Sequence, residues 1–280
     1  MEKFARGRSS EAFRLEDGKV LKLFFNDYPK EYAEREFKNT KIASDTGCTT
    51  MKVYEMVEQD GRYGIVMDYI DGISQNDMPT KNPTYLLKGG KDLARCHQIV
   101  HTKKSHELGD VRQYCVELLD EETFATLTEQ EKQKAKDYIM SLPEDDTIIH
   151  LDFHTGNVLV DDKGNCTVID WMTAQRGNRA IEVAMMEFLF SEAELFPGSS
   201  KLQLAFYTAV RGMIGKQYFK LYQQLMPISA EEIDKYRLLA LIIRRSWNID
   251  FEKENLLNKI KKLIDTCCYP QRSILISENF

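Results

Sequence analysis

One short stretch of the sequence carries four polar residues whose types and spacing suit chemistry on a phosphate group. It reads IIHLDFHTGNVLVDDKGNCTVIDW over residues 148–171, and the four residues are His150, Asp152, Asn157 and Asp170. Phosphoryl transfer needs a carboxylate that orients and deprotonates the attacking hydroxyl, together with oxygen ligands that hold Mg²⁺ against the nucleotide phosphates. Asp152 fits the first role, and the side-chain oxygens of Asn157 and Asp170 fit the second.

Two runs rich in apolar residues explain how separated parts of this stretch could meet. Residues 158–160 and 166–169 flank the turn sequence DDKG at residues 161–164. The pattern predicts a β-hairpin, which would bring Asn157 and Asp170 to the same end of two paired strands. An acidic hairpin on an unrelated surface is the alternative. Four suitable residue types at fixed spacing favour a metal–nucleotide site instead.

The same stretch resembles the catalytic segment of the aminoglycoside phosphotransferase and choline kinase-like family, which has a protein-kinase-like fold. The shared pattern is His-x-Asp-x-x-x-x-Asn, followed by an apolar strand and Ile-Asp-Trp. Protein kinases place Arg before the catalytic Asp and have Asp-Phe-Gly after the second strand. This chain has Leu151 and Asp-Trp-Met there, and no Ala-Pro-Glu follows. Most relatives have Gly at the position of Leu151.

The resemblance implies an α+β, bilobal protein-kinase-like fold. A small lobe with an antiparallel sheet is expected over residues 1–70, and a larger, mainly helical lobe over residues 71–280. Hairpin signals at residues 16–18 and 60–61 support the sheet, because Asp-Gly turns join antiparallel strands. After residue 72, helical periodicity with Pro at the breaks supports the helical lobe.

Two charged residues of the first seventy are candidates for holding the nucleotide. Lys22 lies in the predicted strand 19–24 and Glu36 in the predicted helix 31–44. Taken alone, each is better explained as a solvent-exposed charge, Lys22 on the polar face of its strand. Beside a kinase-like catalytic segment they acquire a joint role, because kinases use a strand Lys on the nucleotide phosphates and a helix Glu to hold it. The resemblance favours Glu36 over Glu34 for that role.

Three further residues are expected to border the nucleotide. Ser10 lies in the segment GRSSEA at residues 7–12, where the family often has a Ser-containing phosphate loop. An ordinary polar turn is the alternative there. Asp68 and Ile70 lie where an apolar strand gives way to a loop, at the hinge between the two expected lobes. The resemblance implies ATP or GTP and Mg²⁺ as cofactors.

Other polar residues are expected to support the catalytic segment. His150 should hold it by hydrogen bonding. Glu182 stands where the family has an aspartate and is expected to anchor the loop through His150 or a nearby amide; a plain helix acid is the alternative. His97 and His101 lie four residues apart on a predicted helix. With no second pair of ligands nearby in the sequence, we interpret them as polar helix residues rather than a transition-metal site.

Composition favours a small-molecule enzyme over a protein that binds nucleic acid or spans a membrane. The 38 basic and 44 acidic residues give a formal charge of −6, whereas nucleic-acid backbones call for a basic face. No apolar run is long enough to span a bilayer, the first residues do not read as a secretory signal, and the six cysteines are scattered. We therefore expect a cytoplasmic protein with reduced thiols.

These observations predict an ATP- or GTP-dependent phosphotransferase that acts on a hydroxyl of a small molecule. A nucleotide-binding pseudoenzyme and a protein-directed kinase are the alternatives; the full set of catalytic side chains disfavours the first, and the missing Ala-Pro-Glu the second. An aminoglycoside-like or other cationic acceptor is one hypothesis, because residues 181–197 contain acids and no Lys or Arg. These acids are Glu182, Glu187, Glu192 and Glu194, and a solvated helix face is the alternative.

Overall fold

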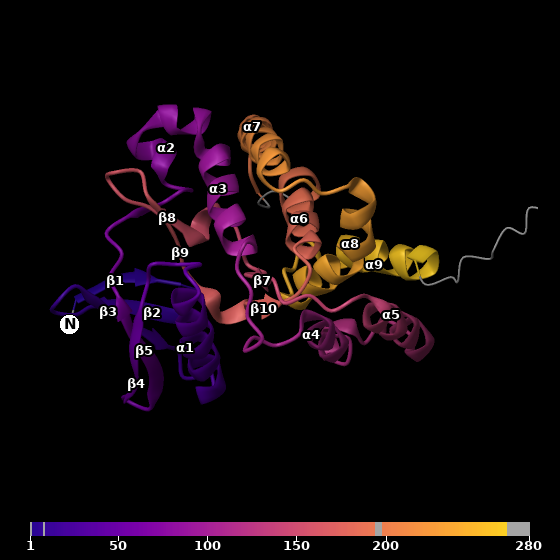
Figure 1. Cartoon of the computed structure of the whole chain (residues 1–280), viewed down its shortest axis with the longest axis horizontal. Helices are drawn as coiled ribbons and strands as arrows, with labels where there is room; N and C mark the ends of the chain where they lie inside the picture. The colour runs from indigo at the N-terminus through magenta and orange to yellow at the C-terminus, as the bar shows by residue number, and fades with distance from the viewer. Residues whose placement is uncertain (1, 8, 194–197, 268–280) are drawn as a thin grey trace, which may run out of the picture.

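The computed structural model describes residues 2–7, 9–193 and 198–267, which form a β-rich N-terminal lobe and a larger helical lobe (Figure 1). Five strands of the N-terminal lobe make one antiparallel sheet, with helix α1 (Lys30–Asp45) packed beside it. Across the sheet the strands are β1 (Glu2–Arg6), β2 (Ser10–Arg14), β3 (Lys19–Phe24), β5 (Arg62–Asp68) and β4 (Val53–Gln59). This is the predicted α+β architecture; the lobe boundary at residues 70 and 71 stays a prediction.

Both predicted hairpin turns are present in the sheet, and each uses two residues with positive φ. Asp17 (φ 61°) and Gly18 (φ 70°) join β2 to β3, while Asp60 (φ 53°) and Gly61 (φ 72°) join β4 to β5. Such turns match the twist of the strands they connect, and Gly and Asp tolerate the left-handed conformation at little cost. The local sequence therefore determines where these strands turn.

Strand β3 presents its residues alternately to two sides of the sheet. Val20 and Phe24 belong to the main hydrophobic core, whereas Leu21 and Leu23 form a small separate cluster on the other side. Alternation places Lys22 on the same side as Val20 and Phe24. Its side chain is only 16% exposed. The interpretation of Lys22 as a solvated residue on a polar face is therefore wrong, because both faces of this strand are covered.

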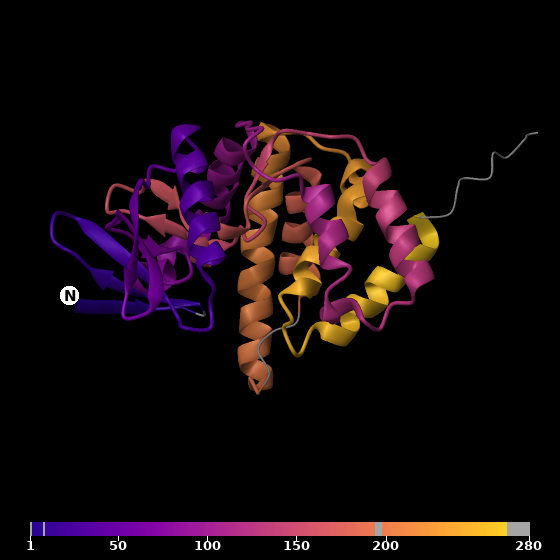
Figure 2. The same cartoon turned by 90° about the horizontal axis from the view of Figure 1, so that it is seen from below.

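The chain after residue 72 is mainly helical, as predicted. Helix α3 (Gly89–His101) packs closely against α7 (Lys201–Leu225), and α6 (Ala180–Glu187) packs against α8 (Ala230–Ser246) (Figure 2). A Cβ atom at Gly90 would lie 2.2 Å from the carbonyl oxygen of Ile214, so only glycine allows α3 and α7 to approach this closely. The other helical segments are α2 (Met78–Lys81), η1 (Pro83–Leu87), α4 (Val111–Leu118), η2 (Glu122–Phe124), α5 (Glu129–Ser141), η5 (Phe188–Glu192) and α9 (Lys253–Cys267).

Two small sheets carry the catalytic segment between the lobes. Strands β8 and β9 pair as the predicted hairpin, with β6 added at one edge, and β7 pairs with β10. These strands are β6 (Ile73–Ser74), β7 (Ile148–Ile149), β8 (Val158–Val160), β9 (Cys166–Val168) and β10 (Gln175–Arg176), and the short turns η3 (Thr155–Asn157) and η4 (Trp171–Thr173) adjoin them. Among the helices of the described residues, none is long and apolar enough to cross a membrane.

Candidate active site

The β8–β9 hairpin brings the two predicted metal ligands, Asn157 and Asp170, to one end of the paired strands. The N–H of Ile169 donates to the carbonyl oxygen of Asn157 at 2.9 Å, so the hairpin pairing continues to its last residues. Asp170 follows with a left-handed backbone (φ 66°) and turns the chain out of the strand. Its side chain is 38% exposed. The carboxylate of Asp170 therefore lies beside Asn157 and remains accessible.

Lys22, Glu36 and Asp170 form a compact charged cluster. The Nζ atom of Lys22 lies 2.7 and 2.8 Å from the two carboxylate oxygens of Glu36 and 3.2 Å from Oδ1 of Asp170. Burial lowers the pKa of Lys22, but the carboxylates of Asp170 and Glu36 outweigh burial and raise it overall. The ammonium in turn holds the pKa of Asp170 below its usual value. Glu34, the rejected candidate, pairs with Lys30 at 2.9 Å on the exposed face of α1.

Burial raises the pKa of Glu36 to about 7, while Lys22 opposes that shift. Since both carboxylate oxygens lie within hydrogen-bond distance of an ammonium whose own pKa is raised, we infer that the pair is ionised at neutral pH.

Hydrogen bonds between Asp152 and Asn157 orient both side chains. The Nδ2 atom of Asn157 donates to the backbone carbonyl of Asp152 at 2.9 Å and to its Oδ2 at 3.0 Å. The amide nitrogen is thus directed at Asp152, which leaves the amide oxygen as the atom available to a metal. Burial, and next the nearby carboxylate of Asp170, raises the pKa of Asp152 to about 7. A carboxylate with such a pKa is suited to take up a proton near neutral pH.

His150 holds the start of the catalytic loop through its two ring nitrogens. Its Nε2 donates to the carbonyl oxygen of Ile169 at 2.9 Å, and its Nδ1 accepts the backbone N–H of Asp152 at 3.2 Å. The ring is fully buried and packs edge-on against Trp171. Burial lowers the pKa of His150, so the neutral tautomer with its proton on Nε2 satisfies both contacts. The loop before Asp152 is therefore tied to the strand before Asp170.

Glu182 in α6 accepts four N–H groups beneath the catalytic loop. The backbone N–H groups of His150 and Leu151 donate to it at 2.9 and 2.7 Å, and Nε2 of His97 and of His101 lie 3.2 and 2.9 Å from its Oε2. Burial would raise the pKa of Glu182, but the two histidines outweigh it and hold that pKa well below its usual value. The expected anchoring of the catalytic loop by Glu182 is confirmed.

The interpretation of His97 and His101 as ordinary polar helix residues is corrected by this cluster. Together with Glu182, they carry ligand atoms within 4.8 Å of one another, as a metal site would require. Each Nδ1, however, lies 2.6 or 2.7 Å from the hydroxyl of Tyr218 or Tyr222 in α7. A hydroxyl on one ring nitrogen and the carboxylate on the other satisfy both imidazoles, so a closed hydrogen-bond network accounts for the cluster. The tyrosines were not predicted, because only the packing of α3 on α7 brings them there.

A cavity of about 480 Å³ lies between the five-stranded sheet and the catalytic hairpin, and the residues predicted to contact the nucleotide line it together with Asp170. They are Ser10, Lys22, Glu36, Asp68 and Ile70. The carboxylate of Asp68 already accepts the hydroxyl of Tyr54 at 2.5 Å and the N–H of Lys52 at 2.9 Å. Asp68 therefore borders the cavity without offering a free carboxylate.

Asn39 of α1 is a residue of the site that was not predicted. Its Nδ2 donates to the carbonyl oxygens of Trp171, Met172 and Ala174 at 3.1–3.2 Å. The side chain is buried, and it ties the helix that carries Glu36 to the segment that follows the catalytic hairpin. The only sequence signal for this role was that Asn39 is a polar residue on the inner face of the predicted helix 31–44. The carbonyl groups that it contacts could not be inferred from the sequence.

The acids of residues 181–197 do not form the acidic rim hypothesised for a cationic acceptor. Glu182 is buried under the catalytic loop. The carboxylate of Glu187 pairs with Arg237 at 2.5 Å, and that of Glu192 pairs with Lys259. Glu194 lies outside the described residues. Glu187 and Glu192 are neutralised by bases distant in the sequence, which the local charge count could not reveal.

The chain has a sheet lobe over a helical lobe, and a cavity lies between the sheet and the hairpin that carries Asn157 and Asp170. This arrangement defines the class of protein-kinase-like phosphotransferases. The chain belongs to the phosphotransferase enzyme family, whose model matches residues 1–226. The predicted membership of the aminoglycoside phosphotransferase and choline kinase-like group is thereby confirmed. A search of curated protein sequences gave no match.

Solved structures of this fold resemble the chain over most of its length. A thermostable mutant of aminoglycoside phosphotransferase APH(4)-Ia has a TM-score of 0.62 at 15% identity, and the match covers 94% of this chain and 92% of that one. Choline kinase LicA from Streptococcus pneumoniae has a TM-score of 0.53 at 15% identity, covering 95% and 92%. An aminoglycoside-3'-phosphotransferase of type VIII has a TM-score of 0.57 at 16% identity, covering 88% and 91%. At these identities the likeness establishes the fold.

Proposed function

We propose that this protein transfers the γ-phosphoryl group of ATP to a hydroxyl group of a small molecule. The observation that carries the proposal is the contact of Lys22 with both Glu36 and Asp170 at the edge of the 480 Å³ cavity. A strand lysine held by a helix glutamate is the device with which kinases grip nucleotide phosphates. Structures of relatives support an adenine nucleotide, since APH(4)-Ia forms a ternary complex with AMP-PNP and hygromycin B and LicA a complex with AMP. GTP is the alternative donor.

The donor atoms near Asp170 fit Mg²⁺. The amide oxygen of Asn157 and the carboxylate of Asp170 are hard oxygen ligands, of the kind that Mg²⁺ prefers, and a metal bound through one or two such groups retains sites for phosphate oxygens. When bound, Mg²⁺ would neutralise charge on the nucleotide phosphates. Lys22 already contacts one oxygen of Asp170 at 3.2 Å, so a metal held by Asp170 would share this carboxylate with the ammonium.

Asp152 is the proposed acceptor of the proton from the attacking hydroxyl. Its Oδ2 is held by the amide of Asn157 at 3.0 Å, and the backbone of its loop is held by His150 and Glu182. The second oxygen, Oδ1, lies 3.5 Å from Nε2 of His154. Burial lowers the pKa of His154 to about 4, so this ring is neutral and competes weakly for the carboxylate. Asp152 can therefore receive a hydroxyl on Oδ1 without breaking its bond to Asn157.

The decisive comparison is between Asp152→Asn and Asp162→Asn. Both variants change one carboxylate of the catalytic stretch to an amide, but Asp162 is exposed in the turn of the hairpin. We expect Asp152→Asn to lower ADP release in the presence of a hydroxylated acceptor by about two to four powers of ten, the contribution of a positioned acid or base, while binding of an ATP analogue with Mg²⁺ is retained. Asp162→Asn should behave as wild type.

The two alternatives give different results in the same assay. A nucleotide-binding pseudoenzyme would bind ATP without acceptor-dependent ADP release from any compound of a broad hydroxylated panel. A protein-directed kinase would label a protein substrate and leave the small molecules unphosphorylated. Either result would overturn the proposal.

A further inference from the structure

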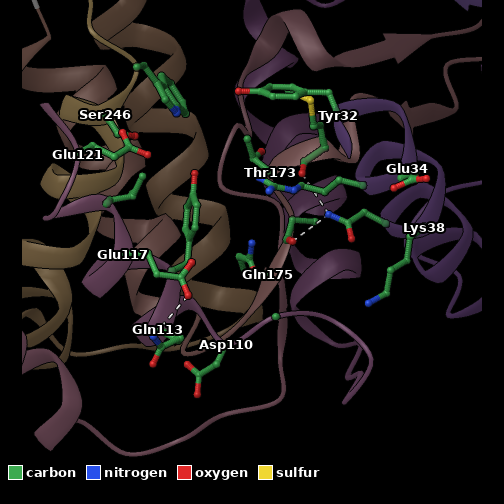
Figure 3. Close-up of a pocket in the computed structure, with 18 residues that line it drawn as sticks. Tyr32, Glu34, Lys38, Asp110, Gln113, Glu117, Glu121, Thr173, Gln175 and Ser246 are labelled. Carbon is green, nitrogen blue, oxygen red and sulfur yellow. Dashed lines mark hydrogen bonds between the residues drawn. The ribbon is translucent and has the colours of Figure 1, made fainter. Parts of the chain in front are cut away.

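A second cavity, of about 760 Å³, lies on the other side of the segment that follows Asp170. Asp170 itself borders the nucleotide cavity, whereas Met172, Thr173 and Gln175 border this second one. Its walls are formed by α1, by α4 with the residues just after it, and by the C-terminal end of α8 (Figure 3). The volume is within the range of small-molecule sites.

The second cavity adjoins the catalytic loop. Thr173, which lines it, donates its hydroxyl to the carbonyl oxygen of His150 at 2.8 Å, two residues before Asp152. Trp247 lines the cavity as well, and the guanidinium of Arg244 lies 5.0 Å from the centre of its ring. The charge of Arg244 also acts on the carboxyl of Asp152. Thr173 and Trp247 thus connect the lining of the cavity, through His150 and Arg244, to the surroundings of Asp152.

Some of the charges around the cavity are already neutralised by neighbouring residues. Glu34 pairs with Lys30 at 2.9 Å, and Asp110 pairs with Arg112 at 2.6 Å. These acids line the cavity, but their charges are compensated, so they contribute little to the recognition of a charged ligand.

Four charged residues of the cavity form no ion pair with one another or with any other described residue. Arg35 and Lys38 belong to α1; Glu117 belongs to α4, and Glu121 follows it. Figure 3 shows Lys38 on one side of the cavity and Glu117 and Glu121 on the other, with Gln175 between them. The cavity thus presents a basic wall from the sheet lobe and an acidic wall from the helical lobe.

Tyr114 lies within electrostatic reach of both walls. Burial contributes most to raising the pKa of its hydroxyl to about 12, and Arg35 and Glu121 shift that pKa in opposite directions. Tyr32 lines the same cavity, and the face of a tyrosine ring attracts cations. One ligand of modest size can therefore meet a positive wall, a negative wall and aromatic surface together.

We propose that the phosphoryl acceptor is a hydroxyl compound that carries both an ammonium and a carboxylate group, as a hydroxy amino acid does, and that it binds in this cavity between α1 and α4. Its carboxylate pairs with Arg35 and Lys38, and its ammonium with Glu117 and Glu121. This inference rests on the proposed function. A polycation would meet the uncompensated charges of Arg35 and Lys38, and a neutral sugar would leave all four charges without an ion-pair partner.

Two sets of probes with matched skeletons test this acceptor class. The small set is serine, ethanolamine and hydroxypropionate; the aromatic set is tyrosine, tyramine and hydroxyphenylpropionate. Within each set, one compound has both charged groups and each of the others lacks one. We expect the amino acid of each set to have a kcat/KM about tenfold higher than that of either compound that lacks one charged group. A factor of about ten is what one charge-assisted hydrogen bond supplies.

Matched variants assign each charged group to its wall. Arg35→Gln should remove most of the advantage of the amino acid over the amine, and Glu121→Gln most of its advantage over the hydroxy acid. Lys41→Gln, exposed on α1, and Glu122→Gln, the neighbour of Glu121, lie outside the cavity lining and should preserve both preferences. The proposal is supported equally if the protein phosphorylates another alcohol that carries both an ammonium and a carboxylate group, provided that Arg35→Gln and Glu121→Gln reduce its kcat/KM in the same way.

The outcomes that overturn this inference differ from those that overturn the proposed function. If the amine or the hydroxy acid is used as well as the amino acid, or if only compounds without both charges are phosphorylated in an Asp152-dependent reaction, the acceptor class is wrong and phosphotransfer stands. If no hydroxyl compound of any class is phosphorylated in an Asp152-dependent way, the proposed function itself fails.

Discussion

Leu151 donates its backbone N–H to the carboxylate of Glu182 at 2.7 Å while holding a left-handed backbone conformation (φ 66°). For a residue with a Cβ atom this conformation costs roughly 1–2 kcal/mol, whereas glycine adopts it without that cost. The Leu151 side chain is 1% exposed, so burial and the bond to Glu182 together offset the strain. The residue that follows is Asp152, whose position depends on this arrangement.

Substitutions at Leu151 should reverse the usual order of Ala and Gly. Both Leu151→Ala and Leu151→Gly remove a buried side chain, a loss that costs about 2–5 kcal/mol for Leu→Ala. Only Gly relieves the left-handed strain. We therefore expect Leu151→Gly to have a free energy of unfolding about 1 kcal/mol higher than Leu151→Ala, measured by urea denaturation. Greater stability of Leu151→Ala would show that the backbone here is not strained.

Lys22 and Glu36 should contribute to phosphotransfer as one unit. Because Nζ of Lys22 contacts both carboxylate oxygens of Glu36, either single substitution to Ala removes the same contact. The double variant should therefore lose much less in kcat/KM than the sum of the single losses, with a coupling energy of about 1–3 kcal/mol. Glu34→Ala, on the exposed face of the same helix, serves as the control and should combine additively with Lys22→Ala. If the losses in kcat/KM of the two single variants add up in the double variant, Lys22 and Glu36 act independently.

Asn39→Ala should destabilise the segment that follows Asp170. The substitution leaves the carbonyl oxygens of Trp171, Met172 and Ala174 without their side-chain donor. An unsatisfied buried polar group costs about 1–3 kcal/mol, so we expect a loss of that size in the free energy of unfolding and weaker binding of Mg²⁺ with an ATP analogue. Lys41→Ala, exposed on the same helix, is the control. An unchanged free energy of unfolding for Asn39→Ala would mean that water replaces the hydrogen bonds of the Asn39 amide without cost.

The buried histidine cluster should make the fold sensitive to acid. Burial first, and His101 next, lowers the pKa of His97 to about 3, against about 6.5 in an unfolded chain. The unfolded state therefore binds more protons, and stability present above about pH 6.5 is lost as the pH falls toward the folded pKa. The pKa of Glu182 is also depressed, so its contribution is lost in the same direction, below its ordinary value of about 4.5.

Urea denaturation between about pH 7 and pH 4 measures this effect. We expect the free energy of unfolding of the wild type to fall across the interval, and that of His97→Gln to fall less steeply, because the variant has one histidine fewer to protonate on unfolding. His106→Gln is the control, since His106 is 84% exposed. Equal slopes for wild type and His97→Gln would show that His97 is already protonated in the folded protein.

The sequence by itself determined the features that depend on near neighbours. The Asp-Gly turns at residues 17–18 and 60–61 fix where the sheet reverses, because few residue types tolerate positive φ. The spacing of Asn157 and Asp170 around a short hairpin likewise places them together, since the pairing of β8 with β9 follows from the turn. The family resemblance that the catalytic motif carries implied the bilobal fold and the phosphotransferase class, and the family match confirms both.

Only the tertiary structure decided which distant groups meet and which charges remain uncompensated. Lys22 and Asp170 lie 148 positions apart and come within 3.2 Å because the sheet lobe packs over the hairpin. The same packing sets Asn39 against the segment after Asp170 and neutralises Glu187 through Arg237. Such contacts depend on the relative placement of whole elements, and local periodicity reports only which face of an element is apolar. Burial then changes the pKa of each group, which no residue type reveals by itself.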